Sequence, residues 1–518
     1  MDNGQFAAEC GINYQLSIVH YQLYKGRFVL TLILSGHDYK YELESVLKLF
    51  IPARRFEFVY NNEDIRLVSG DYFFTRKRIF KSGVLLYVIC KIGDKTSRQT
   101  KILNIHDASD DECEFALSVL LFKCLSKLTG INPKWGIITG VRPVKRVNEM
   151  LDTGMDKEEI KEELSGRFLV SKEKIDIALK TALVQKSARK TTNTDSFSLY
   201  ISIPFCPSRC SYCSFVSQSV DKALKIMDEY IMNLIREIEY TAEITKRLGL
   251  RLDTIYIGGG TPTTLSEADL FILMKKVQDC FDMSSIREYT VEAGRADTIT
   301  REKLEVIKLC GADRISINPQ TLNDDVLKAI DRRHTVEQFY QSYDIAKKIG
   351  FKAINTDLIA GLPTDTVESF KNTIDGIIRL YPENVTVHTL SVKRASNINI
   401  NSEYGVLNNP TDKMIEYATS RLLENGYNPY YLYRQKNMVG NLENIGWERD
   451  NSPSLYNIFI MEEIQTIIAL GAGASTKIVS NDGHLNRIFN YKFPLEYNKH
   501  FDLMLRKKDE IEGFYINA

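Results

Sequence analysis

The sequence lacks an excess of charge of either sign, and it lacks a long hydrophobic run. Among its 518 residues, 67 Lys and Arg side chains balance 67 Asp and Glu side chains, so the formal net charge is zero. This balance removes the electrostatic argument for a dedicated nucleic-acid-binding protein. The best candidate for a membrane span, Phe115–Phe122, stops at Lys123. It falls well short of the ~18 apolar residues that a bilayer span requires.

The amino terminus also lacks a targeting signal. Its first ten residues, MDNGQFAAEC, contain neither the basic segment nor the apolar run of a signal peptide. Hydrophobic residues make up 44% of the chain and charged residues 26%, which is typical of globular proteins in solution. We therefore expect a cytoplasmic protein. The length predicts two to four domains, since a domain usually has ~100–200 residues.

Most of the cysteines follow no pattern. Nine are present, and six of them are scattered along the chain: Cys10, Cys90, Cys113, Cys124, Cys280 and Cys310. In a reducing compartment such residues are typically small buried hydrophobes or idle thiols. The other three lie close together and carry the functional argument.

The first part of the chain alternates short β-rich stretches with turn signals and then becomes helical. Strands are predicted at Ile12–Tyr24, Arg27–Leu34, Phe56–Tyr60 and Gly83–Ile92, and helices at Asp110–Leu128, Lys157–Leu164 and Lys172–Lys186. The polar stretch Ser187–Ser196 has no apolar periodicity. We therefore predict an α+β amino-terminal domain with a helical end at 1–187, and a linker at 188–196.

After the linker, apolar strands alternate with long amphipathic helices. Strands are predicted at Phe197–Ile203, Thr254–Ile257, Glu288–Glu292, Arg314–Ile317, Ile354–Leu358 and Asn384–His388. Helices are predicted at Lys222–Leu248, Glu267–Phe281, Arg301–Leu309, Val336–Ile349 and Val367–Leu380. This alternation is typical of βαβ units and a parallel sheet. Six units are fewer than the eight of a closed barrel, so we predict an α/β fold with a partial (β/α)6 barrel at 197–390.

The remainder, 391–518, is predicted to be a mixed, mainly helical carboxy-terminal domain that covers the active site. It contains a predicted helix at Asp412–Asn425, an aromatic-rich polar loop at Tyr427–Trp447 and a mostly helical end. No internal repeat or low-complexity tract is present.

Three cysteines on one loop point to an iron–sulfur cluster. Cys206, Cys210 and Cys213 have the spacing C-x3-C-x2-C, directly after the first strand of the predicted barrel. That end of a strand is where parallel α/β folds place their chemistry. Three thiolates can hold three irons of a [4Fe–4S] cube. The fourth iron is then open to S-adenosylmethionine, which such a cluster cleaves to a 5′-deoxyadenosyl radical.

Two other uses of three cysteines fit less well. A zinc site needs a fourth ligand nearby, and the neighbouring positions hold Ser211, Tyr212, Ser214 and Phe215. A disulfide is disfavoured in a reducing compartment.

The chain resembles the radical S-adenosylmethionine (radical SAM) superfamily. The cysteine spacing with an aromatic residue, Tyr212, before the last Cys is that superfamily's signature. The longer phrase YISIPFC, which starts at Tyr200, resembles the oxygen-independent coproporphyrinogen III oxidase (dehydrogenase) family. The phrases Trp135–Pro143 (WGIITGVRP) and Tyr433–Asn441 (YRQKNMVGN) resemble its HemZ-type subgroup. The resemblance covers roughly residues 197–500 and implies a [4Fe–4S] cluster and S-adenosylmethionine as cofactors.

The resemblance also implies which residues bind S-adenosylmethionine. The segment Asp253–Pro262 (DTIYIGGGTP) ends in glycines that let a ligand approach the backbone. Glu292 resembles the family's carboxylate for the ribose and amine of the cofactor, and Val387 lies where the family uses backbone near the adenine. The full set implied for the cofactor is Tyr200, Gly259, Gly260, Thr261, Glu292, Gln320, Arg332, Asp357 and Val387. The glycine-rich segment Leu470–Ser475 resembles a loop that covers the site.

The sequence departs from the family's founding members at three positions. The founding members have His where this chain has Ser202, Cys where it has Phe215, and Pro at the position of Ala296. Phe215 is shared with haem-trafficking chaperones of the same superfamily.

Two basic groups are candidates for binding substrate propionates, since arginine pairs with carboxylates in bidentate fashion. Arg434 and Lys436 are preferred, because the aromatic residues nearby could face a macrocycle: Tyr430, Tyr431, Tyr433 and Trp447. The alternative is that these residues form an aromatic core. A second group, Arg142, Lys145 and Arg146, either binds propionates or forms a solvated loop with ion pairs to the acidic run Asp107–Glu114.

These residues lead to a hypothesis of anaerobic oxidative decarboxylation of coproporphyrinogen III to protoporphyrinogen IX in haem biosynthesis. Hydrogen abstraction requires no acid or base from the protein, so no catalytic side chain is assigned beyond the cluster and cofactor. The partners implied are the tetrapyrrole and a one-electron donor such as a flavodoxin or ferredoxin. The alternatives are a haem-binding chaperone of the same superfamily and a radical SAM enzyme that degrades or methylates haem.

Overall fold

The computed structural model describes residues 30–51, 56–60, 70–193, 195–215, 217–391, 410–435, 442–480 and 483–517. They fall into two compact units, one within Met1–Gly140 and Met155–Asp176, the other within Val141–Gly154 and Ile177–Ala518. Helix α6 (Lys172–Lys190) passes from the first to the second and extends into the predicted linker 188–196. Among the described helices, none is both long and apolar enough to span a membrane.

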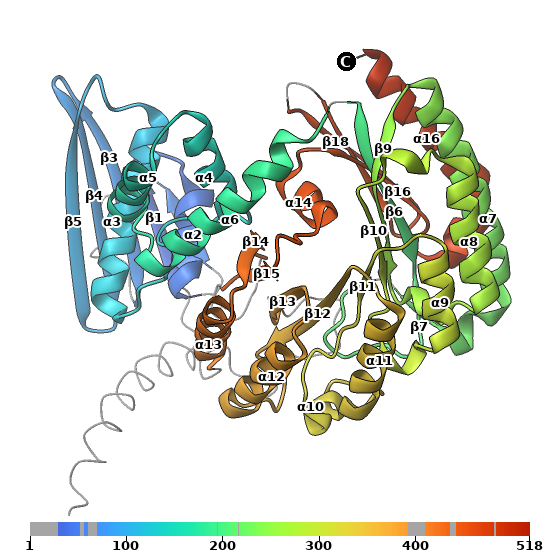
Figure 1. The fold of residues 1–518 in the computed structure, drawn as a ribbon. Coiled ribbons are helices and arrows are strands. Elements are labelled where there is room, and N and C mark those ends of the chain that lie inside the picture. Colours follow the sequence, from blue (N-terminus) through green and yellow to red (C-terminus); the bar gives the residue numbers. More distant parts are fainter. Residues whose placement is uncertain are drawn as a thin grey trace, which may run out of the picture. The chain divides into compact units, whose positions relative to one another are not determined.

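The first unit is built on a five-stranded sheet in the order β2-β1-β3-β4-β5. Its elements are β1 (Leu30–Ser35), α2 (Lys40–Phe50), β2 (Phe56–Tyr60), β3 (Tyr72–Phe80), β4 (Gly83–Ile92), β5 (Lys95–Asn104), α3 (Asp110–Thr129) and α5 (Lys157–Glu162). Helices α2 and α3 pack on one face, where Leu32, Phe73 and Leu117 are fully buried. This confirms an α+β arrangement (Figure 1).

Strands β3 and β5 and helix α2 were not predicted. Basic residues interrupt the apolar pattern of β3, YFFTRKRIF, and β5, KTSRQTKILN. Pairing with β4 along their whole length compensates for this weak local pattern. The predicted strand Ile12–Tyr24 lies outside the described residues.

The second unit contains the predicted parallel sheet. Its six strands are β6 (Ser196–Ile203), β9 (Arg251–Gly259), β10 (Glu288–Glu292), β11 (Arg314–Ser316), β12 (Ala353–Ala360) and β13 (Asn384–Thr389). Each pairs with the next in parallel register. The connecting helices are α7 (Val220–Arg247), α8 (Glu267–Cys280), α9 (Arg301–Leu309), α10 (Asp324–Ala329), α11 (Val336–Ile349) and α12 (Val367–Leu380). The α/β fold class is therefore confirmed.

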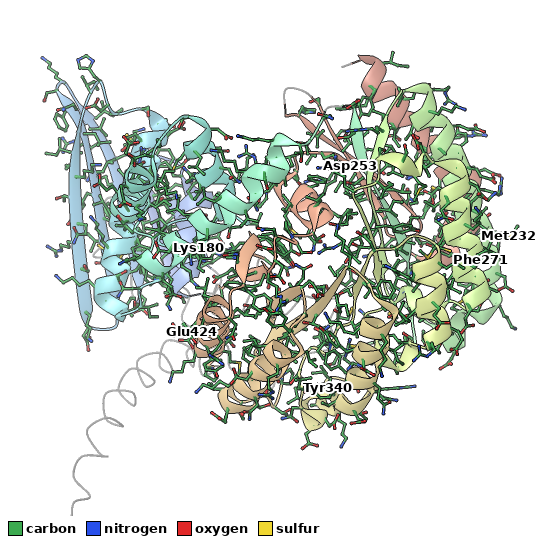
Figure 2. All side chains as sticks on the ribbon, in the orientation of Figure 1. Lys180, Met232, Asp253, Phe271, Tyr340 and Glu424 are labelled. Carbon is green, nitrogen blue, oxygen red and sulfur yellow. The ribbon has the colours of Figure 1, made fainter. Side chains whose placement is uncertain are left out.

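The helices lie along the outer side of the curved sheet (Figure 1). Met232 on α7 and Phe271 on α8 are exposed at the outer surface of this layer (Figure 2). This arrangement leaves the carboxyl ends of the strands available for ligands.

Residues after 410 complete the second unit. They form α13 (Thr411–Glu424), β14 (Asn428–Tyr433), β15 (Asn444–Glu448), α14 (Leu455–Glu462), β16 (Thr466–Leu470), β17 (Ser475–Val479), β18 (Leu485–Phe489), α15 (Pro494–Lys499) and α16 (Phe501–Asn517). The interpretation of Tyr427–Trp447 as a loop is wrong at both ends, because β14 and β15 extend the sheet beside β13 in antiparallel register. At the other edge β16 pairs with β6 in parallel.

Candidate active site

The three cysteines follow the carboxyl end of the first parallel strand. Strand β6 ends at Ile203, and Cys206 lies in the short strand β7 (Phe205–Cys206), which pairs with β8 (Gln218–Ser219). The Cys213 N–H donates to the Cys210 carbonyl (3.1 Å), and the Ser211 N–H donates to the carbonyl of Ile330 (3.1 Å). Cys210 is buried, whereas Cys206 and Cys213 are partly exposed. These bonds fold the loop so that its thiols lie at the inner edge of the sheet.

Hydrogen-bond donors from three other connections of the barrel approach the sulfur atoms. The Thr261 hydroxyl donates to Cys206 Sγ at 3.5 Å, and guanidinium groups of Arg295 and Arg332 lie 3.7 Å and 3.8 Å from Cys210 Sγ. Both arginines are almost completely buried. Buried cations beside sulfur stabilise thiolates and a negatively charged cluster.

Arg295 was not predicted as a site residue. Burial acts to lower its pKa, but the hydrogen bond and ion pair with Asp297 (2.7 Å) raise that pKa above the ordinary value. The guanidinium therefore stays charged. Its position just after β10 was the available signal, because residues at the carboxyl ends of neighbouring parallel strands meet at one edge.

The glycines after β9 allow two strands to come close together at the cysteine loop. A Cβ on Gly260 would lie 2.6 Å from the Phe205 carbonyl oxygen and 3.0 Å from Cys206 Sγ. Gly259 has a φ of +114°, which L-residues rarely adopt. Both positions therefore require glycine, and they line the approach to the loop.

Glu292, at the end of β10, is a carboxylate with an altered protonation equilibrium. Burial raises its pKa to about 7, although the hydrogen bond from the Tyr256 hydroxyl (2.6 Å) acts to lower it. The ring of Tyr256 stacks on that of Tyr456 in α14 (4.5 Å between centroids). Tyr200 on β6 stacks beside them, 6.2 Å from Tyr256. A tyrosine cluster thus lies on the inner side of the sheet next to this carboxylate.

Asp357 on β12 remains ionised. Burial acts to raise its pKa, but hydrogen bonding from His388, together with the Asn355 amide (2.8 Å), holds that pKa below the ordinary value. Gln320 has a φ of 70°, and its backbone N–H donates to the Asp357 carbonyl at 3.0 Å. Val387 pairs with Leu358 in the neighbouring strand. Asp357 and Val387 thus lie on the adjacent strands β12 and β13, and Gln320, which follows β11, forms an isolated bridge to Leu358 of β12.

His334 lies beside this region, and we did not include it among the predicted site residues. It is buried, and burial followed by the positive charge of Arg332 lowers its pKa to about 3. It is therefore neutral at physiological pH.

The predicted substrate residues are less clearly placed. Arg434 follows β14 and is 7% exposed, and burial lowers its pKa while the charge of Glu443 raises it. Lys436 lies outside the described residues. Tyr430, Tyr431 and Trp447 are at most 4% exposed, so the aromatic core is the correct interpretation for these three. Arg142 pairs with Glu463 at 2.8 Å.

The donor set fits an iron–sulfur cluster. Thiols are the preferred ligands of such clusters, and these three share one loop beside buried cations and a hydroxyl donor. In the described parts of the chain, no three His, Cys, Asp or Glu side chains converge as a single metal ion requires. A cube of iron and sulfur spreads its thiolate ligands more widely than one ion does.

Comparison with known proteins agrees with this arrangement. The family model of the radical SAM superfamily matches residues 200–377. The "Oxygen-independent coproporphyrinogen-III oxidase-like protein HemZ" of Bacillus subtilis (strain 168) is 41% identical over 394 residues, covering 74% of this chain and 78% of that protein. The "Heme chaperone HemW" of Lactococcus lactis is 35% identical over 282 residues, covering 54% and 69%.

Among solved structures, the coproporphyrinogen III oxidase HemN from Escherichia coli is 22% identical, with a TM-score of 0.47, over 62% of this chain and 73% of that one. The sequence relationship covers most of both chains in the HemZ alignment. The chain therefore belongs to the radical SAM superfamily and, within it, to the HemZ-type group of oxygen-independent coproporphyrinogen III oxidase-like proteins.

Proposed function

We propose that the protein converts two propionate groups of coproporphyrinogen III to vinyl groups without oxygen and yields protoporphyrinogen IX. The observation that carries this proposal is the 394-residue similarity to HemZ, which extends far beyond the 200–377 segment common to the superfamily. The relationship therefore includes parts of the chain outside the shared radical domain, where determinants of the substrate belong.

In this proposal, residues at different places in the barrel have different roles. Cys206, Cys210 and Cys213 would hold the [4Fe–4S] cluster, while Glu292 on β10 and Asp357 on β12, two strands of one sheet with β11 between them, would orient S-adenosylmethionine. When bound, the cluster and S-adenosylmethionine would supply the radical chemistry needed to remove a hydrogen atom from the β-carbon of a propionate. Loss of CO2 and of one electron to an acceptor then leaves the vinyl group. The protein contributes positioning and exclusion of water rather than proton transfer.

The decisive experiment is an anaerobic turnover assay with the reconstituted protein, a reductant, S-adenosylmethionine and coproporphyrinogen III. We expect protoporphyrinogen to appear together with two equivalents of 5′-deoxyadenosine, both measured by mass spectrometry. Cleavage of the cofactor with no change in the tetrapyrrole would reject the proposed substrate while retaining the radical chemistry.

A haem chaperone is the second candidate. It is favoured by the similarity to HemW and by Phe215, which follows the last cysteine and is 69% exposed. Such a protein would bind haem stably and transfer it to a client, with no decarboxylated product in the same assay. Haem titration followed by Soret absorbance distinguishes the two, and Phe215→Ser would weaken haem binding only if the chaperone activity is present.

The affinity for S-adenosylmethionine is expected to rise with pH through about 7. The raised pKa of Glu292, about 7, means that the carboxyl is largely protonated below this pH. Only the ionised form attracts the cofactor's amine, so a proton must leave before binding, and affinity falls by up to about tenfold per pH unit below 7. Equilibrium binding between pH 5.5 and 8.5 measures this.

Tyr256→Phe should move that midpoint to higher pH. It removes the hydrogen bond that acts to lower the pKa of Glu292, and a charged hydrogen bond of about 1.5–3 kcal/mol corresponds to about 1–2 pH units. Tyr456→Phe is the matched control, since it keeps the ring stack and leaves the bond from Tyr256 to Glu292 in place. An unchanged midpoint in Tyr256→Phe would remove Glu292 from the binding equilibrium.

A further inference from the structure

A pocket of about 560 Å³ lies directly behind the cysteine loop. One wall is Pro207, Ser208 and Arg209, the residues that join Cys206 to Cys210. Another part is Ser219, which pairs with Cys206 between β7 and β8. The opposite wall comes from α10 and the segment that follows it, with Lys328 and Arg333. The segment that joins two of the cluster ligands is therefore part of the pocket wall.

The rim of this pocket carries positive charge. Its lining contains three exposed cationic side chains, Arg209, Lys328 and Arg333, together with the buried Arg332, against the two carboxylates of Asp324 and Asp331. Arg209 and Arg333 are exposed, and the Lys328 side chain is 78% exposed. The Asp324 carboxylate also accepts a hydrogen bond from the Val336 N–H at 2.8 Å. The net charge of the lining favours a negatively charged partner.

The two sides of the cysteine loop have different surroundings. On the inner side, Gly260 closely approaches Phe205 and Cys206, and the carboxylate of Glu292 lies beside Gly258. That side is the place of the cofactor in the proposed reaction. The cationic pocket is lined instead by Pro207, Ser208 and Arg209, between Cys206 and Cys210. An external reductant has to approach where cofactor and substrate leave room, and electron tunnelling weakens steeply with distance, so a surface pocket lined by the segment between two cluster ligands is a suitable place for it.

We propose that an acidic one-electron carrier protein docks over this pocket and reduces the cluster across the Pro207–Arg209 segment. One electron leaves the carrier and enters the cluster, and no bond or proton is exchanged in that step. Complementary charge accelerates and orients such an encounter. The inference needs the cluster but no tetrapyrrole, so it stands apart from the proposed decarboxylation.

Charge reversal at the wall formed by α10 and the segment after it tests the docking surface. The double variant Lys328→Glu/Arg333→Glu reverses two charges there and leaves the sequence of the cysteine loop unchanged. With an acidic flavodoxin as probe, two quantities are measured on the full-length holoprotein at low salt: the Kd for oxidised flavodoxin, and the second-order rate at which reduced flavodoxin bleaches the cluster absorbance. We expect both to worsen by about ten- to a hundredfold. Reduction by dithionite, which needs no docking, should be unchanged.

Matched variants exclude a general effect of surface charge. Lys328 pairs with Asp325 on its helix, and Lys275 pairs with Asp279 on α8, so Lys275→Glu/Lys413→Glu also reverses two exposed lysines and breaks one helical ion pair. This control should bind and react like the wild type, as should Lys328→Arg/Arg333→Lys. Wild-type Kd in the pocket variant, or an equal loss in the control, would overturn the docking site. The Kd for flavodoxin tests the docking site even if the cluster of the variant is impaired. Because no measurement here uses a tetrapyrrole, these results do not depend on the substrate proposed above.

Discussion

Cys213→Ala is expected to lose most of its iron and inorganic sulfide and to cleave S-adenosylmethionine more than about a hundredfold more slowly. The reason is that only three thiols serve the cluster on this loop, and none can be spared. Even the removal of a residue that only orients a metal ligand typically lowers metal affinity or activity by about 10–100-fold. Iron analysis, the visible absorbance of the reconstituted protein and 5′-deoxyadenosine release measure the effect.

Cys280→Ala is the matched control for this experiment. Cys280 is a free thiol of intermediate exposure, like Cys213, but it lies at the end of α8. Its removal should leave iron content and cofactor cleavage unchanged. Full activity in Cys213→Ala after anaerobic reconstitution would contradict the assignment of the cluster ligands.

Lys508→Met is expected to lower the free energy of unfolding by about 3–5 kcal/mol, the usual cost of breaking a buried ion pair. Lys508 on α16 and Glu237 on α7 are both fully buried and lie 3.0 Å apart. The Glu237 carboxylate also accepts hydrogen bonds from the Gly471 N–H (2.8 Å) and the Tyr497 hydroxyl (2.6 Å). Without Lys508 a buried carboxylate remains uncompensated beside the glycine-rich segment after β16. Urea-induced unfolding followed by circular dichroism measures the loss.

A second ion pair between the same helices supplies the control. Arg247 and Glu512 lie 2.9 Å apart but are partly exposed at 48% and 28%. Arg247→Met should barely change stability, because solvent already screens that pair. The double variant Glu237→Gln/Lys508→Met should lose less than the sum of its single variants, since each single variant leaves one buried charge unpaired and the double variant leaves none. Equal effects of Lys508→Met and Arg247→Met would show that burial does not govern this interaction.

The barrel strands were predictable from their local pattern. All six predicted strands between Phe197 and His388 correspond to β6, β9, β10, β11, β12 and β13, with ends that differ by a few residues. Strands buried on both faces read as short apolar runs, and the long amphipathic helices between them have an unambiguous period. The same pattern places Glu292 and Asp357 toward the carboxyl ends of two such strands, whereas their role was predicted from the family resemblance.

The additions to the sheet were not predictable in this way. Strand β14 contains Tyr430 and Tyr431, which favour strands, but it sits in a stretch rich in Asn, Gln and Arg that resembles a loop. Its strand state depends on pairing with β15, which in turn pairs with β13. Likewise β16 becomes a parallel neighbour of β6 across more than 260 residues of sequence. Such pairing is decided by which sheet edge is open, and no local pattern records it.

The cysteine spacing was sufficient to indicate the cluster, because residues only three and four positions apart share one loop in any fold. The surroundings of that loop were decided by the tertiary structure. Arg295 and Arg332 reach Cys210 Sγ from positions 85 and 122 residues away, and the cationic pocket combines the cysteine loop with the segment after α10. Parallel strand order brings these carboxyl ends to one edge. Their proximity is therefore a property of the assembled sheet, whereas the ligand spacing belongs to the chain.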